Sequence, residues 1–128
     1  MLTGAIYLPL DPAQPAARLA DIAEQANVRI CLDTIGNPDL PEFGQSPHAV
    51  SAIDPMPFDP TKPMPGPNDA AYLLFTSGST GVPRGVLVGH FGFTVMVRDQ
   101  IARYSIAQND NYAQLAAATF DASMFEIF

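Results

Sequence analysis

The spacing of apolar residues near the start of the chain predicts a helix. The pattern is the i, i+3, i+4, i+7 repeat of one buried helix face, formed by Leu19, Ile22, Ala23 and Ala26. Pro15 suits the first turn of this helix, because the N–H that proline lacks would have no partner there. Asn27 follows the last apolar position and is expected to end the helix.

Short apolar runs bounded by turn residues predict the strands. Ala70–Phe75 is apolar throughout, which suits a strand buried on both faces. Gly85–Val88 is expected to pair with it as an antiparallel hairpin around the intervening loop. The other expected strands are Val28–Leu32, Ala49–Ile53 and Tyr112–Ala118, and Gly4–Leu10 is expected to be a short strand or an extended segment.

Two further helices are expected in the second half of the chain. One covers His90–Tyr104, with one side formed by Phe91, Val95, Arg98 and Ala102. The other begins within Phe120–Phe128, where Asp121 would be the N-cap. Helices that alternate with strands in this way indicate an α/β fold.

Proline changes this picture only in the middle of the chain. Nine of the thirteen prolines lie between Pro38 and Pro67. Proline lacks a backbone donor and disfavours regular structure. We therefore expect residues 34–69 to be an irregular connection inside a single partial domain that covers residues 1–128.

The charge balance narrows the classes of partner. A net charge of -7 gives no basic stripe for a nucleic-acid backbone and argues equally against docking on anionic lipid. No run approaches the roughly 20 apolar residues that span a bilayer, and no signal peptide is visible, so we expect a soluble, cytoplasmic protein. Cys31 is the single cysteine, which excludes an internal disulfide and a multi-cysteine zinc site, and we expect it to be a small buried residue.

The candidate chemistry lies in the segment that runs from Thr76 to Gly85 and reads TSGSTGVPRG. Its glycines let the backbone approach a ligand closely, and its hydroxyls and N–H groups can donate hydrogen bonds to phosphate oxygens. Arg84 adds a positive charge and a fork of donors. The segment does not follow the Walker A or the Rossmann spacing. An ordinary flexible hairpin tip has a similar composition, so composition alone leaves that alternative open.

The order of residues closely resembles a known family signature. Tyr72–Val86 is similar to the Thr-Ser-Gly-(Ser/Thr)-Thr-Gly-x-Pro-Lys-Gly block of acyl- and aminoacyl-adenylate-forming enzymes. Gly4–Pro12 and Phe120–Phe128 resemble an early block and the Phe-Asp-x-Ser block of adenylation domains in nonribosomal peptide synthetases. The resemblance implies part of the large N-terminal subdomain, in which helices layer on a mixed sheet and a Gly-rich phosphate loop lies between two strands.

The resemblance also implies roles for individual residues. The positions that would contact the β- and γ-phosphates of ATP are Thr76, Ser77, Gly78, Ser79, Thr80, Gly81 and Arg84. Thr80 would also approach a magnesium ion. The family usually has lysine at position 84, so the charge is kept there while the hydrogen-bond geometry differs. A histidine is common after the loop, and His90 is interpreted either in that way or as a locally capped residue at the start of a helix.

Asp121 is the candidate that distinguishes the substrate. In amino-acid-activating members, the aspartate of the Phe-Asp-x-Ser block pairs with the α-ammonium of the substrate, and Ala122 and Phe125 match positions that line the side-chain pocket. A carboxylate in a pocket of low dielectric constant strongly favours such a cation. The simpler interpretations are an N-cap role for Asp121 and core packing for Phe125. These three positions do not identify the amino acid.

The implied reaction uses ATP and Mg²⁺ to convert an amino acid to its adenylate with release of pyrophosphate. The acyl group then passes to the phosphopantetheine thiol of a peptidyl carrier domain. The magnesium, ribose and lysine contacts that the reaction needs would follow Phe128, so this chain alone is expected to be inactive. Two alternatives remain open, a fragment of an acyl-CoA synthetase-like ligase and a non-catalytic remnant or interaction module.

Overall fold

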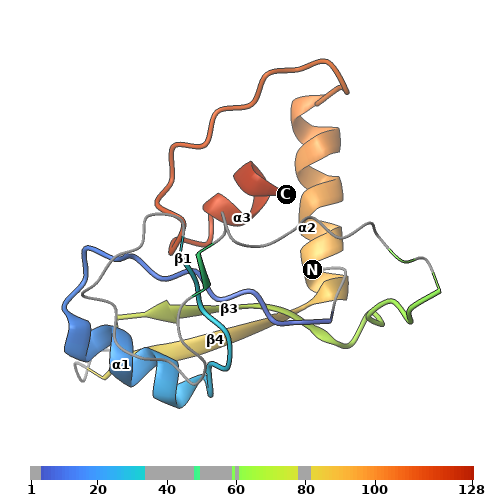
Figure 1. Cartoon of the computed structure of the whole chain (residues 1–128). Helices are drawn as coiled ribbons and strands as arrows, with labels where there is room; N and C mark the ends of the chain where they lie inside the picture. The colour runs from blue at the N-terminus through green and yellow to red at the C-terminus, as the bar shows by residue number, and fades with distance from the viewer. Residues whose placement is uncertain (1–3, 34–47, 50–58, 60, 78–81) are drawn as a thin grey trace. The chain divides into compact units, whose positions relative to one another are not determined.

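The computed structural model describes residues 4–33, 48–49, 59, 61–77 and 82–128, and Figure 1 shows its helices and strands. The chain divides into two compact units. The larger unit combines Met1–Leu10 with Pro63–Phe128, and the smaller unit is Asp11–Lys62. Both contain helices and strands, which confirms the expected α/β class. Much of the predicted connection at 34–69 lies outside the described residues, and its described part after residue 58 contains no helix or strand.

The helix of the smaller unit is α1, Ala16–Gln25, as the apolar spacing predicts. Pro15 is its N-cap, and the Pro15 carbonyl accepts hydrogen bonds from the N–H groups of Arg18 and Leu19. Asn27 ends the helix with a left-handed φ of 49°. The Val28 N–H reaches the Ala23 carbonyl and the Asn27 N–H reaches the Glu24 carbonyl, which is the Schellman pattern of helix termination.

The predicted strand Val28–Leu32 is largely wrong. The strand β1 is only Leu32–Asp33, and it pairs in parallel with β2, His48–Ala49. The preceding residues follow the left-handed turn at Asn27 and have no ladder partner in the described part of the chain, so strand pairing begins only at Leu32. Of the predicted strand Ala49–Ile53, Ala49 belongs to β2 and the remainder lies outside the described residues.

Cys31 is half-buried rather than buried as expected, and it is a free thiol. Partial burial raises the pKa of this thiol, and the negative charge of Asp33 raises the pKa further. Both effects favour the neutral thiol over the thiolate, which is the reactive form of cysteine.

The predicted hairpin is confirmed in the larger unit. Strand β3, Ala70–Thr76, pairs antiparallel with β4, Arg84–Gly89, in a register that places Thr76 opposite Arg84. Tyr7 lies on the other edge of β3, where its N–H bonds the Ala71 carbonyl and its carbonyl accepts from the Leu73 N–H. Gly4–Leu10 is therefore an extended segment with one parallel bridge, and β3 is the central strand of this unit.

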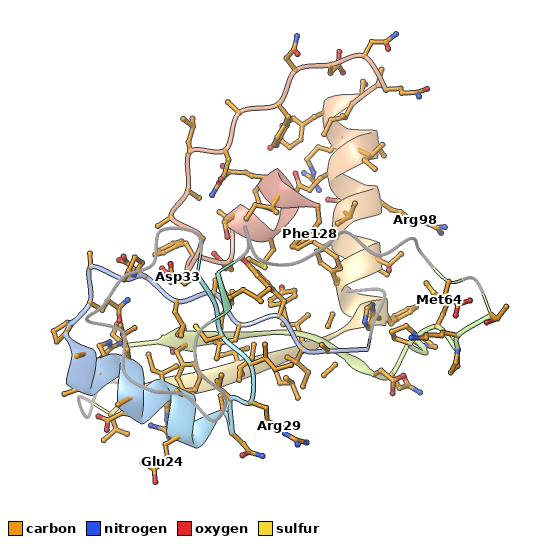
Figure 2. The ribbon with its side chains drawn as sticks, in the orientation of Figure 1. Glu24, Arg29, Asp33, Met64, Arg98 and Phe128 are labelled. Carbon is orange, nitrogen blue, oxygen red and sulfur yellow. The ribbon has the colours of Figure 1, made fainter. Side chains whose placement is uncertain are left out.

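The predicted helix α2, His90–Tyr104, follows β4 directly and rises from one end of the hairpin (Figure 1). The side that faces the core differs from the predicted side. Phe93 and Met96 pack against the core, whereas Phe91 is 67% exposed and Arg98 points outward (Figure 2). Apolar residues occur around much of the helix, so their spacing alone does not select one face.

The core of the larger unit lies where α2 and α3, Ser123–Ile127, meet β3. Its buried members are Ala71, Tyr72, Leu74 and Met124. Burial of β3 is complete for these strand residues, while Leu73 and Phe75 are half-buried, so the expectation of burial on both faces is met only in part.

The predicted strand Tyr112–Ala118 is wrong. This segment has no strand pairing and runs back from α2 to α3 as an irregular stretch (Figure 1). Its Leu115 and Ala116 N–H groups bond instead to the carboxylate of Glu126. Within the described residues, no helix is long and apolar enough to cross a membrane.

Candidate functional site

Strand pairing in the hairpin extends up to the candidate phosphate loop. Thr76 and Arg84 are cross-strand partners, and the Thr76 hydroxyl donates a hydrogen bond of 3.4 Å to the Arg84 carbonyl. The side chains of Thr76, Ser77 and Arg84 are exposed. These three candidates therefore lie together at the base of the loop. Gly78, Ser79, Thr80 and Gly81 lie outside the described residues.

The other end of the hairpin is fixed by backbone contacts with the preceding turn. The His90 N–H donates to the Asp69 carbonyl and the Phe91 N–H donates to the Pro67 carbonyl, each at 2.9 Å. The Asp69 carboxylate in turn accepts from the Gly66 N–H at 2.7 Å. Together these bonds hold the start of α2 against the turn that leads into β3.

The His90 side chain contains a polar atom without a partner among the described residues. Its ring atom Nε2 is buried and has no hydrogen-bond partner in the described part of the chain. A buried polar atom without a partner is costly, and native proteins usually satisfy it. His90 is thus positioned by its backbone at the start of α2, while its side chain leaves one hydrogen bond open.

Arg84 is available to a ligand. Its side chain is exposed, and among the described residues the ion pair that forms joins Arg103 and Asp99 on α2. A guanidinium without a carboxylate partner keeps its fork of donors for an incoming anion. Among all the described residues, there is no group of three or more His, Cys, Asp or Glu side chains that could hold a metal ion.

The second candidate part is the turn before α3. The carboxylate of Asp121 is exposed, and its Oδ1 accepts from the Ala122 N–H at 2.8 Å. The predicted N-cap role of Asp121 is wrong, because Ala122 is the N-cap residue and no side chain caps the helix. The cause is the turn formed by residues 120–123, which moves the start of α3 to Ser123. Ala122 and Phe125 are both half-buried.

The negative charge of Asp121 affects the pKa of a tyrosine on the central strand β3. Burial raises the pKa of the Tyr72 phenol, and the negative charge of Asp121 raises it further. Tyr72 lies on β3 four residues before Thr76, a separation of about 13 Å along an extended strand. The two candidate parts of the site are therefore associated with the same strand.

An aromatic cluster holds the ends of this unit together. Its members are Tyr7, Phe128, Phe93 and Tyr72, which follow one another with ring centroids 5.7–5.8 Å apart in edge-to-face contacts. Figure 2 shows the Phe128 ring beyond the end of α3. Such contacts stabilise by about 0.5–1.5 kcal/mol each beyond their burial. This cluster fixes α3, and with it the Asp121 turn, against β3 and α2.

Sequence reasoning missed two residues that support the Asp121 turn. Ser123 and Glu126 have the Ser-x-x-Glu spacing of a capping box, which would have drawn attention to them. The structure uses both side chains differently, because their partners lie before the helix. The Ser123 hydroxyl bonds the Ala118 and Phe120 carbonyls, and Glu126 bonds the Leu115 and Ala116 N–H groups.

Comparison with known proteins identifies the family of the chain. A family model described as AMP-binding enzyme matches residues 1–128. The chain belongs to the AMP-binding enzyme family.

Among its relatives, surfactin synthase subunit 2 of Bacillus subtilis is 39% identical over 132 residues, which cover 98% of this chain and 4% of that protein. The nonribosomal peptide synthetase FmoA3, solved with α-methyl-L-serine-AMP, has a TM-score of 0.78 at 32% identity and matches 94% of this chain. PA1221, which contains adenylation and PCP domains, has a TM-score of 0.79 at 30% identity and matches 98% of this chain.

The AMP-binding chain is thus similar to one part of much larger proteins. It spans 14% of the FmoA3 chain and 25% of the PA1221 chain. The matches confirm the expected membership of the adenylate-forming superfamily, and the relatives named above include peptide synthetases. Its α/β fold corresponds to the N-terminal part of an adenylation domain, as expected from the sequence.

Proposed function

We propose that this chain contributes triphosphate contacts and one side of the amino-acid pocket to an ATP-dependent adenylation domain of a nonribosomal peptide synthetase. The observation that carries the proposal is the hairpin, which pairs Thr76 with Arg84 and leaves Arg84 exposed without an ion-pair partner among the described residues. A Gly-rich loop held at its stem in this way suits the β- and γ-phosphates of ATP.

The proposed roles follow the family pattern residue by residue. Hydroxyl and N–H donors of Thr76, Ser77, Gly78, Ser79, Thr80 and Gly81, together with the guanidinium of Arg84, would hold the triphosphate. Mg²⁺, which would be approached by Thr80, would neutralise charge on the phosphate oxygens. Asp121 would pair with the α-ammonium of the amino acid, with Ala122 and Phe125 beside its side chain.

In this reaction a substrate carboxylate oxygen attacks the α-phosphorus of ATP, and the bond to pyrophosphate breaks. The aminoacyl group then passes to the phosphopantetheine thiol of a peptidyl carrier domain, and AMP leaves. The PCP domain of PA1221 supports a carrier partner of this kind. We propose that the enzyme is cytoplasmic, because ATP is available in the cytoplasm. The acidic charge of the chain argues against nucleic-acid or membrane partners.

The decisive test is Asp121→Asn in the complete adenylation protein that carries this chain. Asparagine keeps the hydrogen bond to the Ala122 N–H and removes the charge. Loss of one partner of a charge pair in an assembled pocket typically costs about 2–5 kcal/mol, which at its lower end is roughly a 30-fold rise in the amino-acid KM. The KM for ATP should change little, because the phosphate loop is a separate element.

The measurement is amino-acid-dependent exchange of pyrophosphate into ATP, with each proteinogenic amino acid offered in turn to find the best substrate. Thermal melting of the variant controls for folding. An unchanged amino-acid KM in a folded variant would reject the ammonium role of Asp121. Exchange that responds to a simple carboxylic acid and ignores amino acids would instead support an acyl-CoA synthetase-like ligase.

A further inference from the structure

Ser123 is buried at a point that controls the turn carrying Asp121. Its residue has no exposed surface, and its hydroxyl lies 2.9 Å from the Ala118 carbonyl oxygen and 2.6 Å from the Phe120 carbonyl oxygen. Phe120 also accepts the Ser123 N–H at 3.0 Å. The backbone just before Asp121 is therefore bonded to Ser123, the first residue of α3. These bonds join the residues on the two sides of Asp121.

Glu126 holds the segment that leads into this turn. Its Oε2 accepts from the Ala116 N–H at 2.9 Å and from the Leu115 N–H at 3.1 Å. Hydrogen bonds to an ionised acceptor are roughly twice as strong as neutral ones. In the described part of the chain, the hydrogen bonds from residues 111–116 to another element all go to Glu126. The Glu126 carboxylate therefore holds the backbone of this segment in place of a neighbouring strand.

Both residues act from a helix that is itself fixed. Met124, between them in sequence, is fully buried in the core with Ala71, Tyr72 and Leu74. Ser123 and Glu126 are three positions apart, which places them on neighbouring parts of one helix face. A helix anchored to β3 through Met124 can thus pass its position to residues 115–121 through two side chains.

We propose that Ser123 and Glu126 are positioning residues for Asp121, which fix where its carboxylate meets the substrate ammonium. The inference rests on the proposed function of Asp121. It goes further, because it assigns a part in amino-acid recognition to two side chains that bond the backbone before Asp121 and need not touch the substrate. Displacement of a substrate-binding group by about 1 Å can cost on the order of 10²-fold in rate.

The test uses Glu126→Ala, Glu126→Gln and Ser123→Ala in the complete adenylation protein, assayed by pyrophosphate exchange with its best amino acid. We expect Glu126→Ala to raise the amino-acid KM roughly tenfold or more, with the KM for ATP within about twofold of wild type. Glu126→Gln keeps an acceptor for the two N–H groups and should recover much of the loss. Ser123→Ala should act in the same direction.

Asp99→Asn is the matched control, because it removes the charge of another carboxylate that bonds a neighbour, in the exposed pair with Arg103 on α2. Both KM values should be unchanged in this variant. A folded Glu126→Ala protein with an unchanged amino-acid KM would overturn the inference. So would a parallel rise of both KM values that Glu126→Gln does not correct, since general loss of structure predicts that pattern.

The same assay separates this inference from the proposed function. If Asp121→Asn has no effect on the amino-acid KM, the ammonium role fails, and the positioning role fails with it. If Asp121→Asn raises the KM while Glu126→Ala and Ser123→Ala do not, only the positioning role is rejected. Should Ser123→Ala not fold, the Glu126→Ala and Glu126→Gln pair still decides the question.

Discussion

The ring of Phe75 occupies the space that a side chain at Gly85 would need. The two residues are cross-strand partners in the β3–β4 hairpin. A Cβ atom added to Gly85 would lie 3.3 Å from Cζ of Phe75 and 3.0 Å from Cδ1 of Leu73. Since Gly85 directly follows Arg84, this contact helps to set the register at the stem of the candidate phosphate loop.

We predict that substitution at Gly85 destabilises the protein in proportion to side-chain size. Gly85→Ala requires small shifts of Leu73 and Phe75 and should cost about 1 kcal/mol, and Gly85→Val should cost up to about 3 kcal/mol. The free energy of unfolding from chemical denaturation measures both effects. In the Leu73→Ala background the cost of Gly85→Ala should shrink. An equal cost in both backgrounds would show that the Leu73 contact is not responsible.

Asn27 should tolerate glycine better than alanine. Its φ of 49° lies in the left-handed region, where a Cβ-bearing residue other than Asn or Asp is strained by roughly 1–2 kcal/mol. Asn27→Gly should therefore leave the free energy of unfolding nearly unchanged, whereas Asn27→Ala should lower it by about 1 kcal/mol. Alanine at Glu24, an exposed position inside α1, is the matched control. Equal losses for Asn27→Gly and Asn27→Ala would contradict the role of the backbone angle.

Stability should fall in alkaline solution because of two tyrosines. Burial raises the pKa of Tyr7, and burial together with the charge of Asp121 raises the pKa of Tyr72. The folded protein then binds more protons than the unfolded chain above about pH 10, so stability is present below that pH and is lost as the pH rises through it. Tyr7→Phe and Tyr72→Phe should each reduce this loss.

The measurement is the difference in the free energy of unfolding between about pH 8 and about pH 11. Tyr104→Phe is the control, because the Tyr104 side chain is 63% exposed. If Tyr104→Phe reduces the alkaline loss as much as Tyr72→Phe does, burial is not the cause.

The isolated 128-residue polypeptide should self-associate. Large apolar side chains are exposed over β4, α2 and the segment before α3, namely Leu87, Phe91, Leu115 and Phe120, at 59%, 67%, 88% and 67%. Exposed apolar surface of this extent and the outer edge of a strand favour association. Sedimentation velocity over a range of concentrations should show species larger than a monomer. A single monomeric boundary at all concentrations would contradict the expectation.

The sequence predicted most closely those elements whose signal is local. The bounds of α2 and of the hairpin follow from their runs of apolar residues and from the Gly-rich sequence between the two strands. The irregular path of residues 112–118 could not be predicted, because it depends on Glu126, which comes later in the chain. The side of α2 that faces the core could not be predicted either. Phe91 and Phe93 are chemically the same, and tertiary packing determines which of them contacts the core.

The candidate site was predictable to a similar degree. Motif order placed Arg84 at the stem of a loop and Asp121 at the start of a helix, and both positions hold to within a residue or two. The N-cap was assigned to the wrong residue because the Ser123 hydroxyl and the 120–123 turn delay the helix. Such turns are fixed by hydrogen bonds between side chain and backbone, which residue type alone does not specify.

The bridge between Tyr7 and Tyr72 has a consequence for biosynthesis on the ribosome. The strand partner of Tyr7 is translated about 65 residues later, which at roughly 5–20 residues per second is a delay of about 3–13 s. Meanwhile α1 can form, because its hydrogen bonds are local. The N-terminal segment must remain unpaired during this interval, so a nascent chain is exposed to chaperones and to mispairing until β3 emerges from the exit tunnel.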